Sequence, residues 1–192
     1  MKVYVVRHGE SEANANKCFA GWAPVDLTPK GEQDAREAGE LLRHIRFDKI
    51  YSSDTYRTVR TCRLALPDAE FEKTPLIREY SVGSLTGMSF KAMETDPAIA
   101  EHRKHLNFVP YGGEDTPMVL ARLREFVQLL EQRGDETVAV FSHAGAIQLL
   151  GNLLLGLPPE SCVVEAKNGA VTVFEHNGVR WLLDTVNYRK TL

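Results

Sequence analysis

An arginine, a histidine and a glycine follow the first apolar segment of the chain, at Arg7, His8 and Gly9. The segment before them, residues 3–6, is short and rich in β-branched residues, as in a strand covered on both faces of a parallel sheet. Ligands of open α/β sheets lie beyond the carboxyl ends of such strands. The three residues therefore indicate a phosphate pocket, although taken alone they also fit a surface turn with a solvated His8.

The same order of strand, histidine and glycine occurs near the end of the chain. Residues 137–141 are the most strand-like segment, and His143 follows them, just before an apolar stretch typical of a buried helix. A further predicted strand, 47–51, precedes a helix with Arg57 in its first turn. If these strands are parallel neighbours, two arginines and two histidines meet at one edge of the sheet.

This set of side chains suits phosphoryl transfer, whose loose transition state is stabilised by positive charge around the equatorial oxygens. His8 is the candidate nucleophile. We expect neighbouring cations to lower its pKa and a backbone carbonyl to hold its other ring nitrogen. We expect Arg7, Arg57 and a protonated His143 to bind the phosphoryl group.

A leaving alkoxide also needs a proton. Glu79, between a predicted strand and the glycine-rich residues 83–87, is the carboxyl that we expect to supply it. This role requires a raised pKa, which partial burial and the charge of the arriving phosphate promote. A salt bridge to Arg78 or Arg57 is the alternative for this side chain.

Strands alternate with helices, which predicts an α/β fold: a three-layer sandwich with a mostly parallel central sheet and an antiparallel edge strand. Further strands are predicted at 70–74, 163–166, 170–176 and 179–184, the last two as a hairpin. Helices are predicted from Pro29 with Thr28 as cap, from the cap 52–54 to about Leu66, and from the cap Thr116 to about Arg133. In the second helix, Tyr56, Val59 and Leu66 are predicted core residues.

Residues 88–115 contain two prolines and a pair of glycines, and they predict a short helical excursion and a loop that acts as a lid. The lid contains a basic cluster, defined as residues 102–105. One interpretation is that this cluster binds an acidic tail of the substrate. The alternative, which is more common for such a run, is a solvated helix face.

Composition narrows the class of protein. A chain of 192 residues with 43% hydrophobic residues predicts a single domain over 1–192, and a net charge of −3 gives no general attraction to nucleic acid or to an anionic membrane. Three widely spaced cysteines without a CxxC pair indicate reduced thiols and a cytoplasmic setting. We expect no signal peptide before the first strand, and residues 144–157, the longest apolar stretch, are too short to span a bilayer.

Four segments carry a family pattern in order along nearly the whole chain. They are VRHGESEAN at 6–14, SSDTYRT at 52–58, REYSVGSLTG at 78–87 and FSHAG at 141–145. With these segments the chain resembles the histidine phosphatase superfamily, the phosphoglycerate mutase-like proteins. The resemblance implies a phosphohistidine on His8, phosphate contacts from Arg7, Arg57 and His143, and proton donation by Glu79.

The resemblance also implies further contacts. Asn14 and the backbone after His143, at Ala144, would help to hold the phosphate, and Gly21 belongs to a loop that lies near the substrate. No metal ion or organic cofactor is implied.

The leading hypothesis is a cytoplasmic, metal-independent phosphatase for a small phosphorylated metabolite. A phosphoglycerate mutase is the alternative enzyme. Only about 50 residues separate Gly87 from Thr137, so the lid is compact. A mutase must shield its phosphoenzyme from water, and the compact lid therefore favours hydrolysis. A metal hydrolase built on the two histidines and Glu79 is disfavoured by the flanking arginines. A binding-only relative is disfavoured because all five expected groups are present. The substrate and a homodimer are left open.

Overall fold

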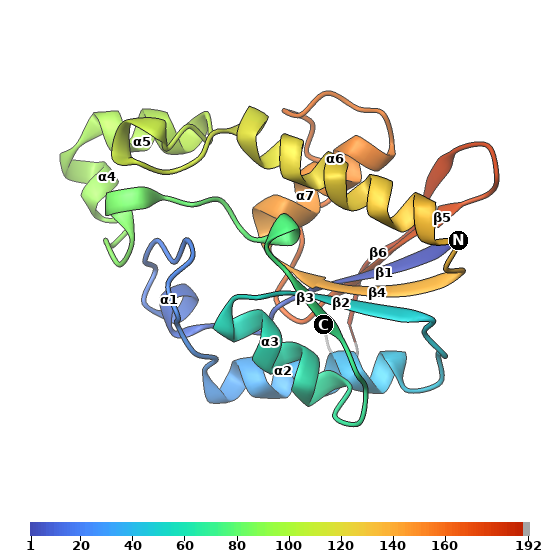
Figure 1. Cartoon of the computed structure of the whole chain (residues 1–192). Helices are drawn as coiled ribbons and strands as arrows, with labels where there is room; N and C mark the ends of the chain where they lie inside the picture. The colour runs from blue at the N-terminus through green and yellow to red at the C-terminus, as the bar shows by residue number, and fades with distance from the viewer. Residues whose placement is uncertain (190–192) are drawn as a thin grey trace.

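Two layers of helices cover the opposite faces of a six-stranded sheet (Figure 1). The computed structural model describes residues 1–189, so the last three residues of the predicted domain lie outside the described part, and the single-domain assignment stays a prediction. Across the sheet the strands are β3 (Glu72–Thr74), β2 (Lys49–Ser53), β4 (Thr137–Ser142), β1 (Lys2–Arg7), β5 (Val171–His176) and β6 (Trp181–Tyr188). The first four are parallel, and β5 and β6 are each antiparallel to the preceding strand. This confirms the predicted mostly parallel sheet with an antiparallel edge.

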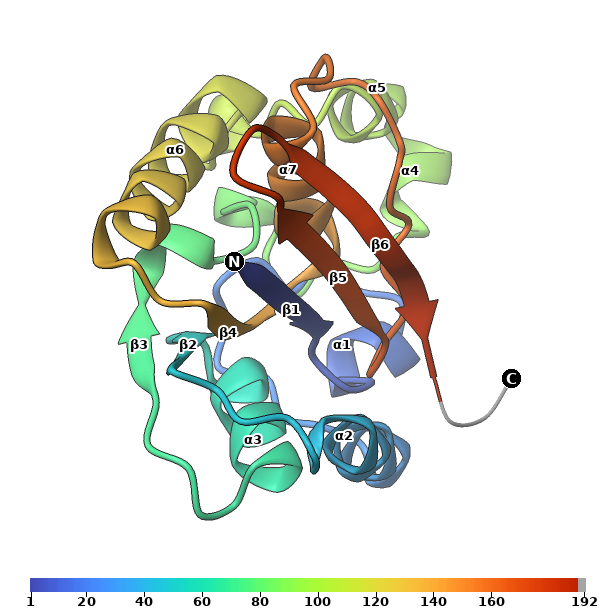
Figure 2. The ribbon, with the colours of Figure 1, turned by 90° about the vertical axis from the view of Figure 1, so that its right-hand side faces the viewer.

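Four longer helices form the outer layers, as Figure 2 shows: α2 (Pro29–Leu42) and α3 (Tyr56–Ala65) on one face, α6 (Thr116–Arg133) and α7 (Ala144–Leu154) on the other. The short helices α1 (Glu12–Ala15), α4 (Ala92–Thr95) and α5 (Pro97–Lys104) gather at the end of the sheet to which β1 and β4 point (Figure 1). Within residues 1–189, no helix combines the length and the apolar character needed to cross a membrane.

The central strands are buried on both faces because their alternate side chains enter two separate apolar clusters. Val3, Val5 and Val140 belong to the cluster that includes α6 and α7. Val6 and Phe141 belong to the cluster that includes α2 and α3. This burial explains why the strands are continuous apolar runs in the sequence, and it fixes the register of the strand ends that carry polar residues.

The predicted strand at 163–166 is wrong. This segment has no regular secondary structure, although Val164 is buried in the core. The carbonyl of Ala166 accepts a hydrogen bond from Arg7 Nη1 at 2.7 Å. The apolar run is therefore explained by packing beside the site, where a backbone oxygen holds an arginine.

Two predicted helix starts are also wrong. Asp115, and not Thr116, caps α6, because its side chain accepts from Met118 N. Helix α3 begins after Thr55 and not after the predicted cap at 52–54.

The start of α3 determines which of its faces is buried. Tyr56, a predicted core residue, is 51% exposed, and Val59 and Leu66 are only partly buried. The buried face instead contains Arg57, Thr58, Thr61, Cys62 and Ala65. Polar side chains on the inner face of a helix give no apolar periodicity, so the pattern assigned the wrong face.

The predicted lid segment, 88–115, contains α4 and α5 and is fixed at both ends. At its start, Phe19 N donates to Met88 O at 2.9 Å and Phe90 N donates to Lys17 O at 2.8 Å. At its other end, Glu114 N donates to the carbonyl of Ser81 at 2.8 Å. A lid function for this segment stays a prediction.

The loop after β1 lies directly on α2 because two glycines meet there. A Cβ built on Gly9 would lie 2.0 Å from Gly31 O, and one built on Gly31 would lie 1.9 Å from Glu10 O. No side chain fits at either position. This contact sets the distance between α2 and the loop that starts with His8.

We expect Gly31→Ala to lower the free energy of unfolding by roughly 1–3 kcal/mol because the added methyl overlaps backbone atoms. In an unhindered helix the same change normally stabilises by about 1 kcal/mol, so the sign itself is diagnostic. Urea unfolding measures it. Glu40→Ala, at an exposed position of the same helix, is the control and should change stability by less than about 0.5 kcal/mol. Equal or higher stability of Gly31→Ala would contradict the close contact.

Candidate active site

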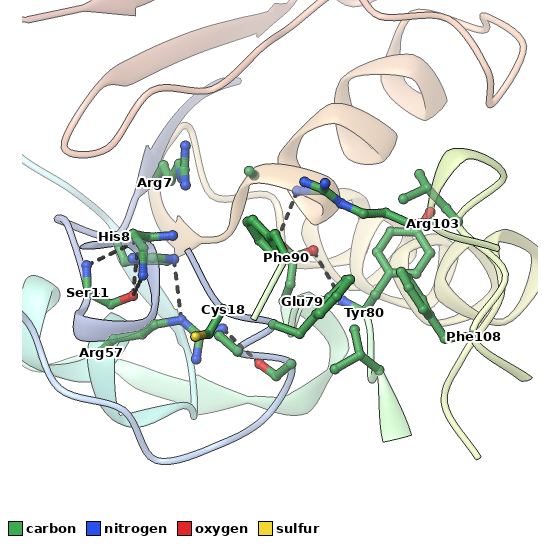
Figure 3. A pocket seen from close by; sticks show the side chains of 18 of the residues that line it. Arg7, His8, Ser11, Cys18, Arg57, Glu79, Tyr80, Phe90, Arg103 and Phe108 are labelled. Atoms are coloured by element: carbon green, nitrogen blue, oxygen red, sulfur yellow. Dashed lines mark hydrogen bonds between the residues drawn. The ribbon is translucent and has the colours of Figure 1, made fainter. Parts of the chain in front are cut away.

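The register of the parallel strands brings the predicted side chains together (Figure 3). Arg7 in β1 pairs with Ser142 in β4, so His8 and His143 leave the sheet at the same level. Their ring centroids are 5.2 Å apart. On the other side of β4, β2 leads into α3, which places Arg57 against both imidazoles.

His8 is a buried, neutral imidazole whose Nε2 carries the lone pair. Its Nδ1 lies 2.7 Å from Gly9 O and must donate, because a carbonyl oxygen only accepts. Arg57 Nε then donates to Nε2 at 3.3 Å. Burial lowers the pKa of His8 well below its usual value, and the charges of Arg57 and Arg7 lower it further. The predicted carbonyl partner is confirmed as that of Gly9, and burial outweighs the predicted effect of the cations.

Arg57 is 1% exposed and contacts both histidines. Its guanidinium donates to four acceptors, which are His8 Nε2 (3.3 Å), His143 Nδ1 (3.1 Å), Gly21 O (2.8 Å) and Ala23 O (3.4 Å). Burial lowers the pKa of Arg57 to about 10, and the nearby Glu79 carboxylate opposes this shift. The group therefore keeps its positive charge at neutral pH.

His143 is neutral, and the prediction of a protonated His143 is wrong for the free protein. The residue is fully buried, and burial lowers the pKa of its imidazole well below the usual value, with Arg57 as the next cause. A guanidinium only donates, so Nδ1 accepts from Arg57 and Nε2 carries the hydrogen. Nε2 then donates to Ser53 Oγ at 2.9 Å. The sequence does not show how deeply this histidine is buried.

Arg7 has an unused buried donor. Its Nη1 donates to Ala166 O, but its Nε is buried and has no hydrogen-bond partner in the described part of the chain. An unpaired buried donor costs free energy, so its position indicates where an acceptor oxygen of a ligand binds. Burial lowers the pKa of Arg7, and the charges of Glu79 and Asp34 oppose that effect.

The carboxylate of Glu79 lies at the beginning of α7. Its Oε1 accepts from Tyr80 N and its Oε2 from Gly145 N, both at 3.1 Å. A Cβ on Gly145 would lie 2.5 Å from Glu79 Oε1, so only glycine permits this approach. The alternative of a salt bridge is not realised: Arg78 pairs with Asp54 at 2.5 and 2.6 Å, and Glu79 forms no salt bridge within residues 1–189.

A buried ion pair that the sequence pattern did not predict holds the segment around Glu79. Arg122 Nη2 donates to Glu79 O at 3.1 Å, and Arg122 Nε donates to Glu114 Oε1 at 3.1 Å. Glu114 Oε2 in turn accepts from Ser81 N at 2.8 Å. Trp22 Nε1 adds a second donor to Glu79 O at 2.7 Å. The pair thus connects α6 and the end of the lid segment to the carboxyl-bearing turn.

The three residues assigned by resemblance alone, Asn14, Gly21 and Ala144, line the same pocket. Asn14 Oδ1 accepts from Ser11 Oγ at 3.0 Å, which fixes the orientation of its amide. Gly21 uses its carbonyl to hold Arg57, and Ala144 is the first residue of α7. Binding of phosphate by these three residues stays a prediction.

Of the predicted site residues, all but the fully buried His143 line a pocket of about 380 Å³ (Figure 3). Its inner end combines the guanidinium groups of Arg7 and Arg57 with the amino end of α7, which together favour a phosphate anion. The lone pairs that a metal ion would need, on His8 Nε2 and His143 Nδ1, both accept from Arg57. Within residues 1–189, no three metal-ligating side chains gather into a cluster.

Comparison with protein families matches residues 3–189 to the histidine phosphatase superfamily (branch 1). This chain belongs to that superfamily. Among its relatives, the adenosylcobalamin/alpha-ribazole phosphatase of Salmonella typhimurium is 31% identical over 167 residues, covering 84% of this chain and 83% of that protein. The 2,3-bisphosphoglycerate-dependent phosphoglycerate mutase of Xanthobacter autotrophicus is 32% identical over 186 residues, 89% of each protein.

Solved structures of the superfamily share the fold over almost the entire length. The alpha-ribazole phosphatase of Shigella flexneri superposes with a TM-score of 0.89 at 26% identity, covering 98% of this chain and 97% of the other. A mycobacterial glucosyl-3-phosphoglycerate phosphatase, solved with VO3, superposes with a TM-score of 0.86 at 26% identity, covering 97% and 98%.

Because both histidines are neutral in the folded chain, we expect the free energy of unfolding to depend on pH. Because their pKa values are lower in the folded chain than the usual value near 6.5, the unfolded chain binds more protons below that pH. The free energy of unfolding should therefore fall as pH decreases from about 6.5, with a slope approaching about 1.4 kcal/mol per pH unit for each histidine. Urea unfolding between pH 7.5 and about 5.5 measures this slope.

In this experiment His143→Gln should remove about half of the slope, because one of the two buried imidazoles is lost. His44→Gln, at an exposed position, is the matched control and should keep the slope of the wild type. A slope that is the same in all three proteins would contradict the assignment.

Proposed function

We propose that this protein hydrolyses phosphomonoesters of small metabolites through a phosphohistidine on Nε2 of His8. The observation that carries the proposal is the state of His8, a neutral imidazole whose unprotonated Nε2 faces a charged guanidinium at the inner end of the pocket. Membership of the superfamily supports this activity.

In the first step, the phosphoryl group binds to Arg7 and Arg57 at the amino end of α7. Nε2 of His8 gives up its hydrogen bond from Arg57 Nε and attacks phosphorus in line, and the ester P–O bond breaks. The electron pair of that bond stays on the leaving oxygen, which takes a proton from the carboxyl of Glu79. The positive charge of Arg57 and the unused Nε of Arg7 stabilise the equatorial oxygens.

In the second step, water attacks the phosphohistidine. The carboxylate of Glu79 takes a proton from the water, the P–N bond breaks, and its electron pair returns to Nε2 of His8. Inorganic phosphate then leaves. The ion pair of Arg122 and Glu114 keeps Glu79 in place for both proton transfers.

The names of the relatives support a phosphorylated metabolite as substrate, since they include phosphatases of alpha-ribazole and of glucosyl-3-phosphoglycerate. A mutase relative at 32% identity makes phosphoryl transfer between carbons the competing activity. Incubation with 3-phosphoglycerate and 2,3-bisphosphoglycerate separates the two: hydrolysis releases inorganic phosphate, whereas a mutase interconverts the phosphoglycerates.

The proposal has two further parts: catalysis needs no metal ion, and the protein works in the cytoplasm. Arg57 occupies the histidine lone pairs that a metal would need, which supports the first point. Three free cysteines, Cys18, Cys62 and Cys162, support a reducing compartment. A small-molecule substrate, with neither nucleic acid nor membrane as partner, belongs to the same proposal, and a homodimer stays open.

His8→Ala should remove turnover and the covalent phosphoenzyme together, with kcat reduced at least about 10³-fold, because the phosphoryl group then lacks the imidazole nitrogen to which it is transferred. Rapid acid quench with a radiolabelled phosphate ester measures both. His44→Gln is the control and should label like the wild type. Labelling that survives the loss of His8 would refute the proposed nucleophile.

Glu79→Gln should slow esters of ordinary alcohols by about 10²–10⁴-fold but p-nitrophenyl phosphate much less, because an activated leaving group needs no proton. Steady-state kcat for the two ester classes measures the difference. Equal slowing of both classes would show that Glu79 acts only on the structure of the pocket.

A further inference from the structure

We propose that the leaving group of the substrate carries an aromatic ring, which binds in the outer half of the pocket against Phe90 and Arg103. The proposal rests on the proposed phosphatase function and names the substrate class of the same site. It is argued from the side chains that line the pocket away from His8.

Aromatic rings contribute to the outer wall of the pocket, beside aliphatic side chains such as Val82 and Leu106. Phe19, Phe90, Phe108 and Tyr80 all line it. Their rings pack edge to face, with centroids 4.9 Å apart for Phe19 and Phe90, 6.3 Å for Phe19 and Phe108, and 6.1 Å for Tyr80 and Phe108. Phe19, Tyr80 and Phe108 are at most 5% exposed, so the partly exposed Phe90 is the ring of this cluster that can give an additional ring an offset or edge-on contact.

One residue of the basic cluster completes this wall. The guanidinium carbon of Arg103 lies 4.3 Å from the ring centroid of Phe90 and 5.8 Å from that of Phe19. Figure 3 shows Arg103 extending from the lid segment toward the pocket. A guanidinium stacked on one ring presents its second face to another ring, which it attracts by a cation–π contact.

The other members of the basic cluster are engaged elsewhere. Lys104 and His105 both contact Glu101, and the ring of His102 packs on Tyr111. In the described part of the chain, Arg103 contacts no carboxylate, and it is the one member of the cluster that lines this pocket. Arg103 is exposed, as expected for a solvated helix face, but its side chain also lines the pocket.

Size and preorganisation favour a ring over a small acid. A volume of about 380 Å³ lies within the range of pockets that bury ring-containing small molecules. The backbone of Phe90 is fixed by its hydrogen bond to Lys17, and that of Phe108 by its bond to Glu114 O at 2.9 Å. A ring thus meets a wall that is already in place, which reduces the entropic cost of binding.

The test compares phenethyl phosphate with n-propyl phosphate, because both leave as ordinary alkoxides and differ mainly in the ring. We expect the wild type to prefer the phenethyl ester at least about tenfold in kcat/KM. Phe90→Leu and Arg103→Gln should each reduce this ratio at least about fivefold. Lys104→Gln, next to Arg103 but outside the pocket lining, is the matched control and should keep the ratio.

Equal kcat/KM values for the two esters, or an unchanged ratio in both variants, would overturn the aromatic site. A preference for 3-phosphoglycerate over both esters that is lost in Arg103→Gln would also overturn it, because Arg103 would then bind an acidic group of the substrate. A failure of the phosphatase proposal is recognised separately, since neither ester would then release phosphate.

Binding of non-hydrolysable analogues keeps the two proposals distinct. Calorimetry with phenethyl phosphonate and propyl phosphonate requires no turnover, so it tests the ring site even in an inactive protein. We expect the phenethyl analogue to bind at least about fivefold more tightly, and Phe90→Leu to remove most of the difference. Equal affinities would overturn the proposal whatever the catalytic activity.

Discussion

A single buried guanidinium organises this site. Arg57 has four acceptors, two of them imidazole nitrogens and two of them carbonyls of the loop before α2. A charge at 1% exposure is tolerable only because all these partners are in place. Burial keeps both imidazoles neutral, and the charge of Arg57, to which each offers a lone pair, lowers their pKa values further. The positive charge of the pocket and the neutral state of His8 therefore both depend on the buried arrangement around Arg57.

The fold supplies that constraint through register and close approach. The alternation of the strands between two apolar clusters fixes β1, β4 and β2 so that their polar ends coincide. Glycines at positions 9 and 31 let α2 touch the loop that begins with His8, and Gly145 lets Glu79 reach the amino end of α7. Arg122 and Glu114 then hold Glu79 from the side of α6. Arg7 lies in β1 and Arg57 in α3, whereas His8 and Glu79 lie on loops that packed elements hold in place.

Sequence reasoning reached the sheet, its edge and the residues that converge there because buried strands and their polar ends leave strong local patterns. It failed where the outcome depends on how deeply a side chain is buried. His143 was expected to be protonated, and only its complete burial against Arg57 shows that it is neutral. Tyr56 was expected in the core because the inner face of α3 is polar. Arg122, between apolar residues of α6, gives no local sign that it is part of the site.

The most direct test of this account is the protonation of His8, measured by ¹⁵N chemical shifts of the histidine-labelled protein at neutral pH. The account predicts a neutral ring with the hydrogen on Nδ1, bonded to Gly9 O, and no hydrogen on Nε2, whose lone pair accepts from Arg57 Nε. Arg57→Lys should disturb this signal, because a lysine cannot bridge both imidazoles and the loop carbonyls. A hydrogen on Nε2 of His8, or on both nitrogens, would contradict the account.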